Sequence, residues 1–385
     1  HNLTLAAEKL SMSVAEARAI TAALRPNPIL TVSGQQLNLL GADYSSISPL
    51  GPNQVNFHVD LPLETAGKRQ KRVALAREDR TLAEWGVREI MRQVIAAVQS
   101  AFVDVQQAQN NLSLAKENLA SLERVVAINE DRLKAGDASR VEVDRSRVAA
   151  IQYRTAVRQA EAQVEQAKLT LQQLLGRKPF DPAFEIAGVL RQDALSVTQK
   201  ELLDRALLQR PDYRAQNQAQ ARSKADLTLQ LANAKVDWLV GAEMTRQAAY
   251  GYQGNSLGFS VSVPLPVWSK NQGEIARATR DITQAGARKV AIESVIGLEV
   301  EKSYRQYLVS RQLAQSLESD LLEKARSVRE TTEFSYRRGE ASLVEFLDAQ
   351  RAYNDAVQSS NDARAQYARS LYTLDTVTGA TVAGN

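Results

Sequence analysis

The sequence predicts a mixed, mainly α fold, in which several copies of the chain share a transmembrane β-barrel that continues as a coiled-coil α-helical barrel. Three observations predict it: long tracts without proline, four short segments of alternating apolar and polar residues, and a repeat of half the chain. The proline-free tracts are rich in Ala, Leu, Gln, Glu, Arg and Lys, which favour helices.

The helices are predicted from four tracts, residues 68–134, 137–175, 270–338 and 340–378, which contain no proline and few or no glycines. At about 1.5 Å per residue, the longer ones would each extend roughly 100 Å. Apolar residues recur every seven positions along the first tract, beginning at Met91, and along the third, beginning at Val300. This spacing predicts coiled-coil packing, and a simple structural coiled coil would show it too.

Two tight turns are predicted between these tracts. Gly136 and Gly339 can take the left-handed conformation that ends a helix. Ser139 and Ser342, three residues later, can cap the helix that follows. Two helical hairpins result, with tips at 134–139 and 337–342.

The chain is a duplication of one half-molecule. Residues 59–63 (VDLPL) correspond to 261–265 (VSVPL), 202 positions later, and a long helical tract follows each. The hairpin tips correspond as well, with 136–142 (GDASRVE) and 339–345 (GEASLVE) at an offset of 203. Each half therefore reads as two strands, a long helix, a turn and a returning helix.

The strands are predicted from alternation. In the first of these segments Val55, Phe57 and Val59 are apolar, whereas His58 and Asp60, which alternate with them, are polar. Two further segments alternate around Val240 and Phe259, and a fourth runs through Leu30, Val32, Leu37 and Leu39 with a slip near Gly34. Aromatic residues lie near the expected strand ends or loops, as in the interface girdles of membrane barrels, although any sheet surface can carry them: Tyr44, Trp238, Tyr250, Tyr252 and Trp268.

Alternation of this kind suits a barrel wall between lipid and water, and it also suits a soluble sheet over a core. The sequence offers no covering layer for a soluble sheet, which favours the barrel. Four strands cannot close, because the smallest membrane barrels have about eight. Three chains would supply twelve strands, and their long helices would continue as a tube.

Composition excludes several classes of protein. The 385 residues include no cysteine and two histidines, and the net charge is only +4 without a basic block. We therefore expect no catalytic, cofactor or metal site and no nucleic-acid partner. No apolar run approaches the about 18 residues of a membrane-spanning helix. Neither a leader nor a cysteine for a lipid anchor is present, so we expect a mature or trimmed product.

The chain resembles the TolC-like outer membrane efflux proteins, closest to heavy-metal members of the CusC and CzcC type. The resemblance covers nearly the whole chain and depends on the order of several segments within the duplicated frame. These are 25–28 (RPNP), 61–69 (LPLETAGKR), 136–142 and 336–349 (YRRGEASLVEFLDA).

The resemblance implies a homotrimer in the Gram-negative outer membrane, with a twelve-stranded barrel and a helical barrel in the periplasm. It also implies a passive exit duct rather than an enzyme. A periplasmic adaptor protein and an inner-membrane RND-type pump would be its partners, together with outer membrane lipid. The cargo, toxic cations or organic compounds, stays open.

The resemblance also implies functional residues at the tips. Glu345 and Asp348 match acidic positions that ring the periplasmic aperture, and Tyr336 and Glu142 match a link that holds related ducts closed. In the best-known member an arginine completes this link, where this chain has Ala341, so Arg140, Arg337 or Arg338 would have to replace it. A solvated helix face is the alternative for the two carboxylates.

The turns match the adaptor-docking grooves of the family, and ordinary capped turns are the alternative. The docking residues are Gly136, Ser139, Val141, Gly339, Ser342 and Val344.

The expected division follows the repeat. A non-membrane coiled-coil scaffold is the chief alternative for the whole chain, and a periplasmic adaptor with a hairpin is a second. The segments are 1–25 (N-terminal helix in an equatorial region), 26–66 (first barrel hairpin), 67–176 (first helical hairpin), 177–235 (equatorial region), 236–267 (second barrel hairpin), 268–378 (second helical hairpin) and 379–385 (tail).

Overall fold

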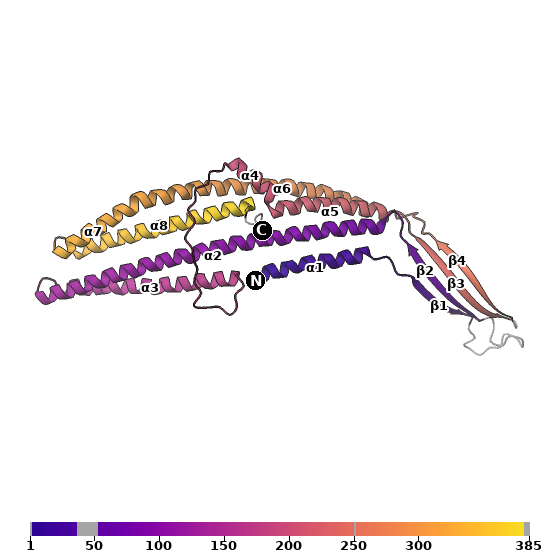
Figure 1. The fold of residues 1–385 in the computed structure, drawn as a ribbon, viewed down its shortest axis with the longest axis horizontal. Coiled ribbons are helices and arrows are strands. Elements are labelled where there is room, and N and C mark those ends of the chain that lie inside the picture. Colours follow the sequence, from indigo (N-terminus) through magenta and orange to yellow (C-terminus); the bar gives the residue numbers. More distant parts are fainter. Residues whose placement is uncertain (1, 37–52, 250–251, 381–385) are drawn as a thin grey trace. The chain divides into compact units, whose positions relative to one another are not determined.

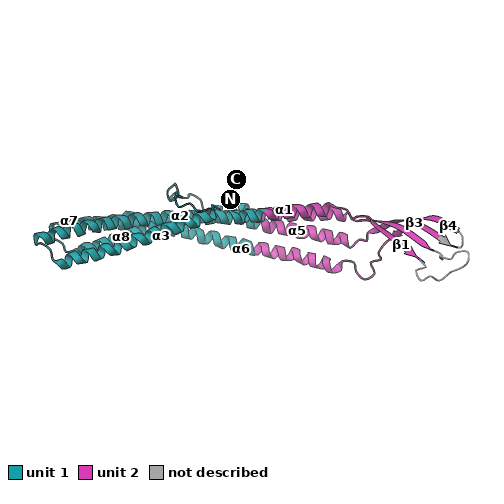
Figure 2. Ribbon diagram, turned by 90° about the horizontal axis from the view of Figure 1, so that it is seen from below, with its two compact units in different colours: residues 1–9, 86–214, 291–385 teal, residues 10–85, 215–290 magenta. Residues whose placement is uncertain are grey.

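The computed structural model describes residues 2–36, 53–249 and 252–380. The described chain is mainly helical with one four-stranded sheet, which confirms the mainly helical class. Leu37, Leu39, Tyr44 and Tyr250, which the sequence analysis placed in or near strands, lie outside the described residues. The chain forms two compact units, here called the tip unit (1–9, 86–214, 291–385) and the sheet unit (10–85, 215–290; Figure 2).

The elements follow one another as the repeat predicts, with strands before each long helix (Figure 1). In chain order they are α1 (Leu3–Ala23), β1 (Ile29–Gln35), β2 (Gln54–Leu63), α2 (Lys68–Ala135), α3 (Arg140–Leu174), α4 (Gln199–Gln209), α5 (Pro211–Asn233), β3 (Trp238–Ala249), β4 (Tyr252–Ser262), α6 (Gln272–Ser316), a π-helical turn (Leu317–Leu322), α7 (Glu323–Arg338) and α8 (Leu343–Thr378).

The sheet is antiparallel in the order β1-β2-β3-β4. Its register places Phe57 opposite Met244, and Met244 opposite Leu257, on one face. His58 lies opposite Glu243 on the other face. The alternation along each strand thus separates an apolar face from a polar face.

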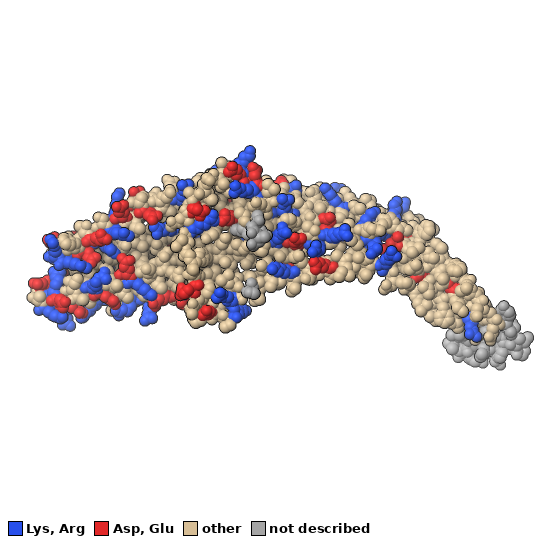
Figure 3. Space-filling model, in the orientation of Figure 1, with Lys and Arg blue, Asp and Glu red and all other residues tan. Residues whose placement is uncertain are grey.

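The apolar face of the sheet is exposed. Leu257 is 77% and Phe259 86% exposed, and Leu30, Val32 and Val261 are each more than half exposed. In Figure 3 charged side chains cover the helices on the face shown, whereas the described part of the sheet carries few. Burying such side chains contributes about 25 cal/mol per Å² of apolar surface, so this face calls for an apolar environment.

In the tip unit, α2 pairs with α3 and α7 pairs with α8 (Figure 1). Arg147 on α3 bonds Glu130 on α2 at 2.6 Å, which ties the first pair near its tip. The second pair buries Leu343 and Phe346 against Tyr336 and against Val125 of α2. The two hairpins therefore share a core close to their turns.

Residues 175–198 form no helix or strand and pack on the helices instead. Phe184 and Ile186 cover Val98 and Leu171. Further along, the backbone N–H of Leu195 donates to the Tyr307 hydroxyl at 2.9 Å. The segment is thus held by apolar contacts in its middle and by a hydrogen bond near its C-terminal end.

Among the described residues, no helix is both long and apolar enough to span a membrane. The same part of the chain contains no cluster of three or more His, Asp or Glu side chains arranged for a metal ion.

Candidate functional site

The two hairpin turns have the same backbone structure, as their sequences predict. Gly136 (φ +86°) and Gly339 (φ +78°) both take the left-handed conformation. The N–H of Asp137 donates to the carbonyl of Arg132 at 2.8 Å. In the second turn, the N–H of Glu340 donates to the carbonyl of Ser335 at 2.9 Å. Both turns satisfy the last carbonyls of the incoming helix in this way, which confirms the predicted helix ends.

The outgoing helices begin with matching caps, which confirms that Ser139 and Ser342 cap these helices. The Ser139 hydroxyl accepts from the N–H of Glu142 at 3.2 Å, and the Glu142 carboxylate accepts from the N–H of Ser139 at 3.0 Å. Ser342 and Glu345 repeat both bonds, at 3.2 and 2.6 Å. Reciprocal bonds of this kind satisfy two N–H groups that have no partner in the helix.

The cap fixes the carboxylate of Glu345 at the N-terminus of α8. Its hydrogen bonds from Ser342 lower the pKa of Glu345 below the ordinary value of 4.5, so the exposed side chain is ionised near neutral pH. Asp348 lies one turn further along α8, also exposed, 3.6 Å from a guanidinium nitrogen of Arg351. The two predicted aperture carboxylates therefore both lie at the solvent.

Tyr336 is buried in the core near the tips, at 2% exposure. Its ring stacks on Phe346 with centroids 5.5 Å apart, and its hydroxyl hydrogen bonds to Oδ1 of Asn129. Burial raises the pKa of Tyr336, so the hydroxyl keeps its proton. The fold thus gives Tyr336 a partner on α2.

The structure brings Tyr336 and Glu142 into no hydrogen bond within the described chain, since Glu142 closes its own cap. Ala341 packs against the cluster around Tyr336. Of the three arginines considered for the link, Arg337 pairs with Glu333 at 2.6 Å and Arg338 lies over the ring of Phe334.

A groove of about 520 Å³ runs between the first turns of α3 and α8. It brings together two predicted docking residues, Val141 and Val344, with the predicted aperture residue Asp348. Both valines are more than half exposed. The other lining residues are Asp144, Arg145, Val148, Ala149, Gln152, Leu347 and Arg351. A groove lined by both apolar and charged side chains can receive an amphipathic helix.

Amide side chains connect the two hairpins in the interior, a feature that the sequence analysis missed. Buried Gln350 on α8 donates to Oδ1 of Asn118 on α2 at 3.0 Å, and also to Asn354 at 3.0 Å. Asn354 in turn donates to the hydroxyl of Tyr153 on α3 at 2.8 Å. Asn111 and Asn118, seven residues apart and each directly before an apolar heptad position, Leu112 and Leu119, are the sequence signal that could have indicated it.

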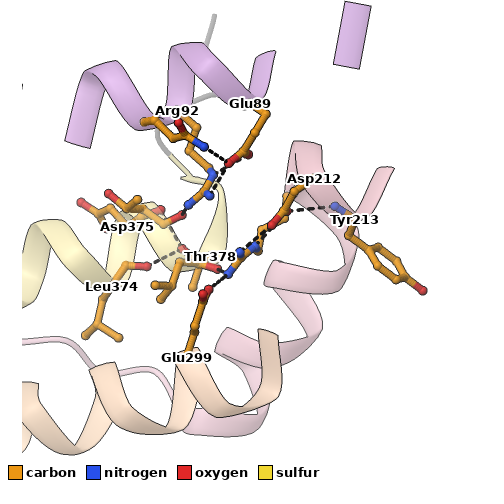
Figure 4. A network of polar contacts seen from close by, with 12 residues as sticks. Glu89, Arg92, Asp212, Tyr213, Glu299, Leu374, Asp375 and Thr378 are labelled. Carbon is orange, nitrogen blue, oxygen red and sulfur yellow. Dashed lines mark hydrogen bonds and ion pairs between the residues drawn. The ribbon is translucent and has the colours of Figure 1, made fainter. Parts of the chain in front are cut away.

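Two arginines donate hydrogen bonds to the last carbonyls of α8, at its C-terminal end (Figure 4). Arg92 donates to the carbonyl of Thr376 at 3.0 Å and is paired with Glu89 at 2.6 Å. Arg210, 2% exposed, donates to the carbonyl of Val377 at 3.4 Å. Positive groups at this end complement the negative end of the helix dipole.

Arg210 is neutralised by two carboxylates. It makes a two-bond pair with Asp212, at 2.6 and 3.0 Å, and it pairs with Glu299. Burial alone would raise the pKa of Asp212, but the hydrogen bonds and charge of Arg210 lower it below its ordinary value. The sequence does not indicate the contacts of Arg210 with Glu299 and Val377, which lie 89 and 167 residues away along the chain.

The polar face of the sheet holds His58 between two carboxylates. Its Nε2 lies 2.8 Å from Asp60, and its Nδ1 lies 3.6 Å from Glu243. The prediction that His58 is a polar residue facing away from the apolar face agrees with this position. A Cβ at Gly241 would overlap the Ser260 hydroxyl and lie 2.8 Å from the His58 ring, so these two side chains share the polar face there.

Comparison with curated proteins gives one significant relative. The chain is 26% identical over 393 residues to the cobalt-zinc-cadmium resistance protein CzcC of Cupriavidus metallidurans, a match that covers 98% of this chain and 86% of that protein.

Solved structures share the fold. A membrane protein from Pseudomonas aeruginosa superposes with a TM-score of 0.79 at 21% identity, over 98% of this chain and 87% of that one. The outer-membrane channel OprN superposes with a TM-score of 0.77 at 19% identity, with the same coverage of 98% and 87%.

The family model described as "Outer membrane efflux protein" matches residues 1–177 and 202–380, which is most of the sequence. This match agrees with the resemblance drawn from the repeat and the tip segments. The chain belongs to the outer membrane efflux protein family.

Proposed function

We propose that three copies of the chain form the outer membrane duct of a tripartite efflux system. The observation that carries this proposal is the sheet: β1 and β4 each have one neighbouring strand among the described residues, and one face is apolar and exposed. Unpaired strand edges are costly in lipid, where no water satisfies the backbone. Pairing β4 of one copy with β1 of the next removes every edge and gives twelve strands around a polar lumen.

The helices of the three copies would continue the barrel as a tube in the periplasm. Segment 175–198 with α4, α5 and the end of α8 would form the equatorial belt around it. The division of the chain into barrel hairpins (26–66, 236–267), helical hairpins (67–176, 268–378) and belt supports the same reading. Transport would be passive, since the side chains gathered at the tips are caps and ion pairs.

The partners would be a periplasmic adaptor protein and an inner-membrane pump. The groove between α3 and α8 is the proposed adaptor site, with Val141 and Val344 as its exposed apolar contacts and the turns at Gly136, Ser139, Gly339 and Ser342 shaping it. The relation to a cobalt-zinc-cadmium resistance protein favours divalent metal cations as the cargo. Such ions would pass and not be held, because stable sites need clustered ligands.

The proposed aperture is a ring of carboxylates from Glu345 and Asp348 of three copies. Both side chains are exposed at the start of α8, and threefold repetition would bring six negative charges toward one axis. Such a ring attracts cations and resists anions, and its negative charges repel one another across the axis. The Tyr336 contact with Asn129 joins α7 to α2 and would oppose separation of the two hairpins there.

Two neighbouring residues of β4 test the barrel. Leu257 lies on the apolar face and Ser256 on the polar face. Leu257→Arg places a charge in lipid, at a cost of about 2–4 kcal/mol per chain near the bilayer centre, whereas Ser256→Arg faces the lumen. We expect Leu257→Arg to reduce membrane-extracted trimer strongly and Ser256→Arg to leave it near the wild-type amount.

The readout is the amount of threefold particles with a detergent-covered end, counted by electron microscopy. Equal loss in both variants, or a water-soluble wild-type protein without detergent, contradicts the duct and favours a coiled-coil scaffold.

A further inference from the structure

Two lysines at equivalent positions of the repeat have different surroundings in the sheet unit. Lys68 follows Pro62-Leu63 at the same spacing as Lys270 follows Pro264-Leu265. The Lys68 side chain is 8% exposed, lies 2.7 Å from Asp237 and donates to the carbonyl of Lys235 at 2.7 Å. Lys270 is exposed, and its ammonium group has no carboxylate partner within the described residues. The first copy therefore uses its lysine structurally, whereas the second copy leaves the charge free.

Lys270 lines a pocket of about 360 Å³ next to the ends of β3 and β4. Lys235, a second exposed lysine without an ion pair in the described chain, lines it too. The carboxylate in the lining, Asp237, is already paired with Lys68. The pocket thus has two available ammonium groups and uncharged polar groups from Asn233, Ser269 and Asn271.

The surface beside this pocket is apolar and exposed. Leu265 is 80%, Val267 64% and Trp268 89% exposed, just beyond the end of β4. They follow the apolar face of β4, where Phe259 and Val261 are exposed in the same way. Tryptophan is enriched where a membrane meets water, and a basic group directly beyond it lies at the depth of lipid headgroups.

The equivalent pocket of the first copy has a different set of charges. It is lined by Arg25, Glu64, Lys68 and Arg69, among others. Glu64 is paired with Arg72, and Arg69 donates to the carbonyl of Ala23 at 2.6 Å. Arg25 and Arg69 make no ion pair in the described chain, so both pockets carry positive charge. The second differs in lying beside the exposed Leu265, Val267 and Trp268.

We propose that the pocket at Lys235 and Lys270 binds the phosphate headgroup of an anionic phospholipid, with its acyl chains along Leu265, Val267 and the apolar face of β4. The proposal rests on the outer membrane duct proposed above, which places this end of the strands at the periplasmic leaflet. Lysine binds phosphate as a point charge, and its stem can lie along apolar surface. In the trimer, three such lipids would fix the depth of the barrel.

The test compares Lys235→Gln/Lys270→Gln with the matched control Lys116→Gln/Lys324→Gln, which removes two exposed lysines from α2 and α7. Purified trimers are titrated with phosphatidylglycerol or phosphatidylcholine in detergent, and bound lipid is counted by native mass spectrometry. We expect wild type and control to prefer phosphatidylglycerol by about tenfold or more, from roughly 1 kcal/mol per lysine, and the pocket variant to lose this preference.

An unchanged preference in the pocket variant overturns the proposal. Equal binding of phosphatidylcholine by the wild type also overturns it, because the apolar face alone would then account for binding. Displacement of the lipid by millimolar inorganic phosphate would assign the pocket to a free anion instead. Channel activity in planar bilayers is measured on the same samples: its absence in the wild type rejects the duct itself, whereas its presence with an unchanged lipid preference rejects only the pocket.

Discussion

The two ends of α8 are both capped, but by different means. At the N-terminal end the cap is local: Ser342 and Glu345 come from the helix and its turn, and both are exposed. At the C-terminal end the cap is remote: Arg92 from α2 and Arg210 from the α4–α5 junction reach its last carbonyls, and both are buried.

The difference indicates which end can move. A local cap travels with its helix, so the tip end can change position without losing these hydrogen bonds. A remote cap holds only while α8 stays in place, since moving the helix would leave its last carbonyls without their donors. Gly379 reinforces this, because a Cβ there would lie 3.0 Å from the backbone of Gln209 and Arg210. We infer that α8 would pivot about its C-terminal end.

The largest effect is expected from Arg210→Ala. Loss of the guanidinium leaves Asp212, which is mostly buried, without its counter-charge and removes a donor from the carbonyl of Val377. Breaking a buried ion pair lowers the free energy of unfolding by about 3–5 kcal/mol. Because Glu299, the second partner, is 44% exposed and stays hydrated, we expect a loss near the lower value. Denaturant unfolding followed by circular dichroism measures the loss.

Arg205→Ala is the matched control, because Arg205 is exposed on α4. We expect it to change the free energy of unfolding by less than about 0.5 kcal/mol. Similar curves for Arg210→Ala and Arg205→Ala would contradict the fixed end. Hydrogen exchange at 370–378 should rise in Arg210→Ala while exchange at the start of α8 changes little.

A smaller effect is expected from Tyr336→Phe at the tip. The change leaves Asn129, which is fully buried, without the bond to its Oδ1, and its Nδ2 already has no partner among the described groups. An unsatisfied buried amide costs about 1–3 kcal/mol. If the contact also restrains the tip, single-channel conductance should rise.

The double variant Asn129→Leu/Tyr336→Phe separates the hydrogen bond from packing. Replacing both partners by apolar groups can be nearly neutral, so we expect stability to recover toward wild type while conductance stays high. Recovery of neither property would contradict the proposed restraint, and so would a Tyr336→Phe variant with wild-type values of both.

The elements of the fold were largely predictable because their signals are local. Gly136 and Gly339 had to take positive φ, Ser139 and Ser342 had the spacing of caps, and alternation placed the strands at Phe57 and Phe259. Each depends on residues within a few positions, where backbone sterics and hydrogen bonding decide the structure.

The partners of the site residues were not predictable because they lie far apart in the sequence. Tyr336 bonds Asn129, 207 residues away, and Arg210 reaches Val377, 167 residues away. The sequence shows an asparagine in a helix and an arginine before a proline, and neither residue type specifies which helix packs beside it. The resemblance suggested Glu142 for Tyr336, but a capping box at α3 occupies that carboxylate.

The smallest effect on stability, and a distinct effect on transport, is expected from Glu345→Gln/Asp348→Asn. Glutamine serves the cap as well as glutamate does, so the free energy of unfolding should change by less than about 0.5 kcal/mol. Removal of the charges should weaken block by divalent cations in planar bilayers and alter conductance. Glu142→Gln, at the same cap position of the other tip, is the control and should leave the block unchanged.

The pH dependence of the block sharpens this last test. Because hydrogen bonds from Ser342 lower the pKa of Glu345, its charge and its cap are fully present above 4.5 and disappear only as the pH falls through the lowered value. Cation block in the Asp348→Asn single variant should therefore persist below pH 4.5, while in Asp348→Asn/Ser342→Ala, which also removes one of those bonds, it should fade at a higher pH. Identical pH profiles in these two variants would mean that the capped carboxylate does not face the permeating ions, and the N-terminal end of α8 would then carry no aperture.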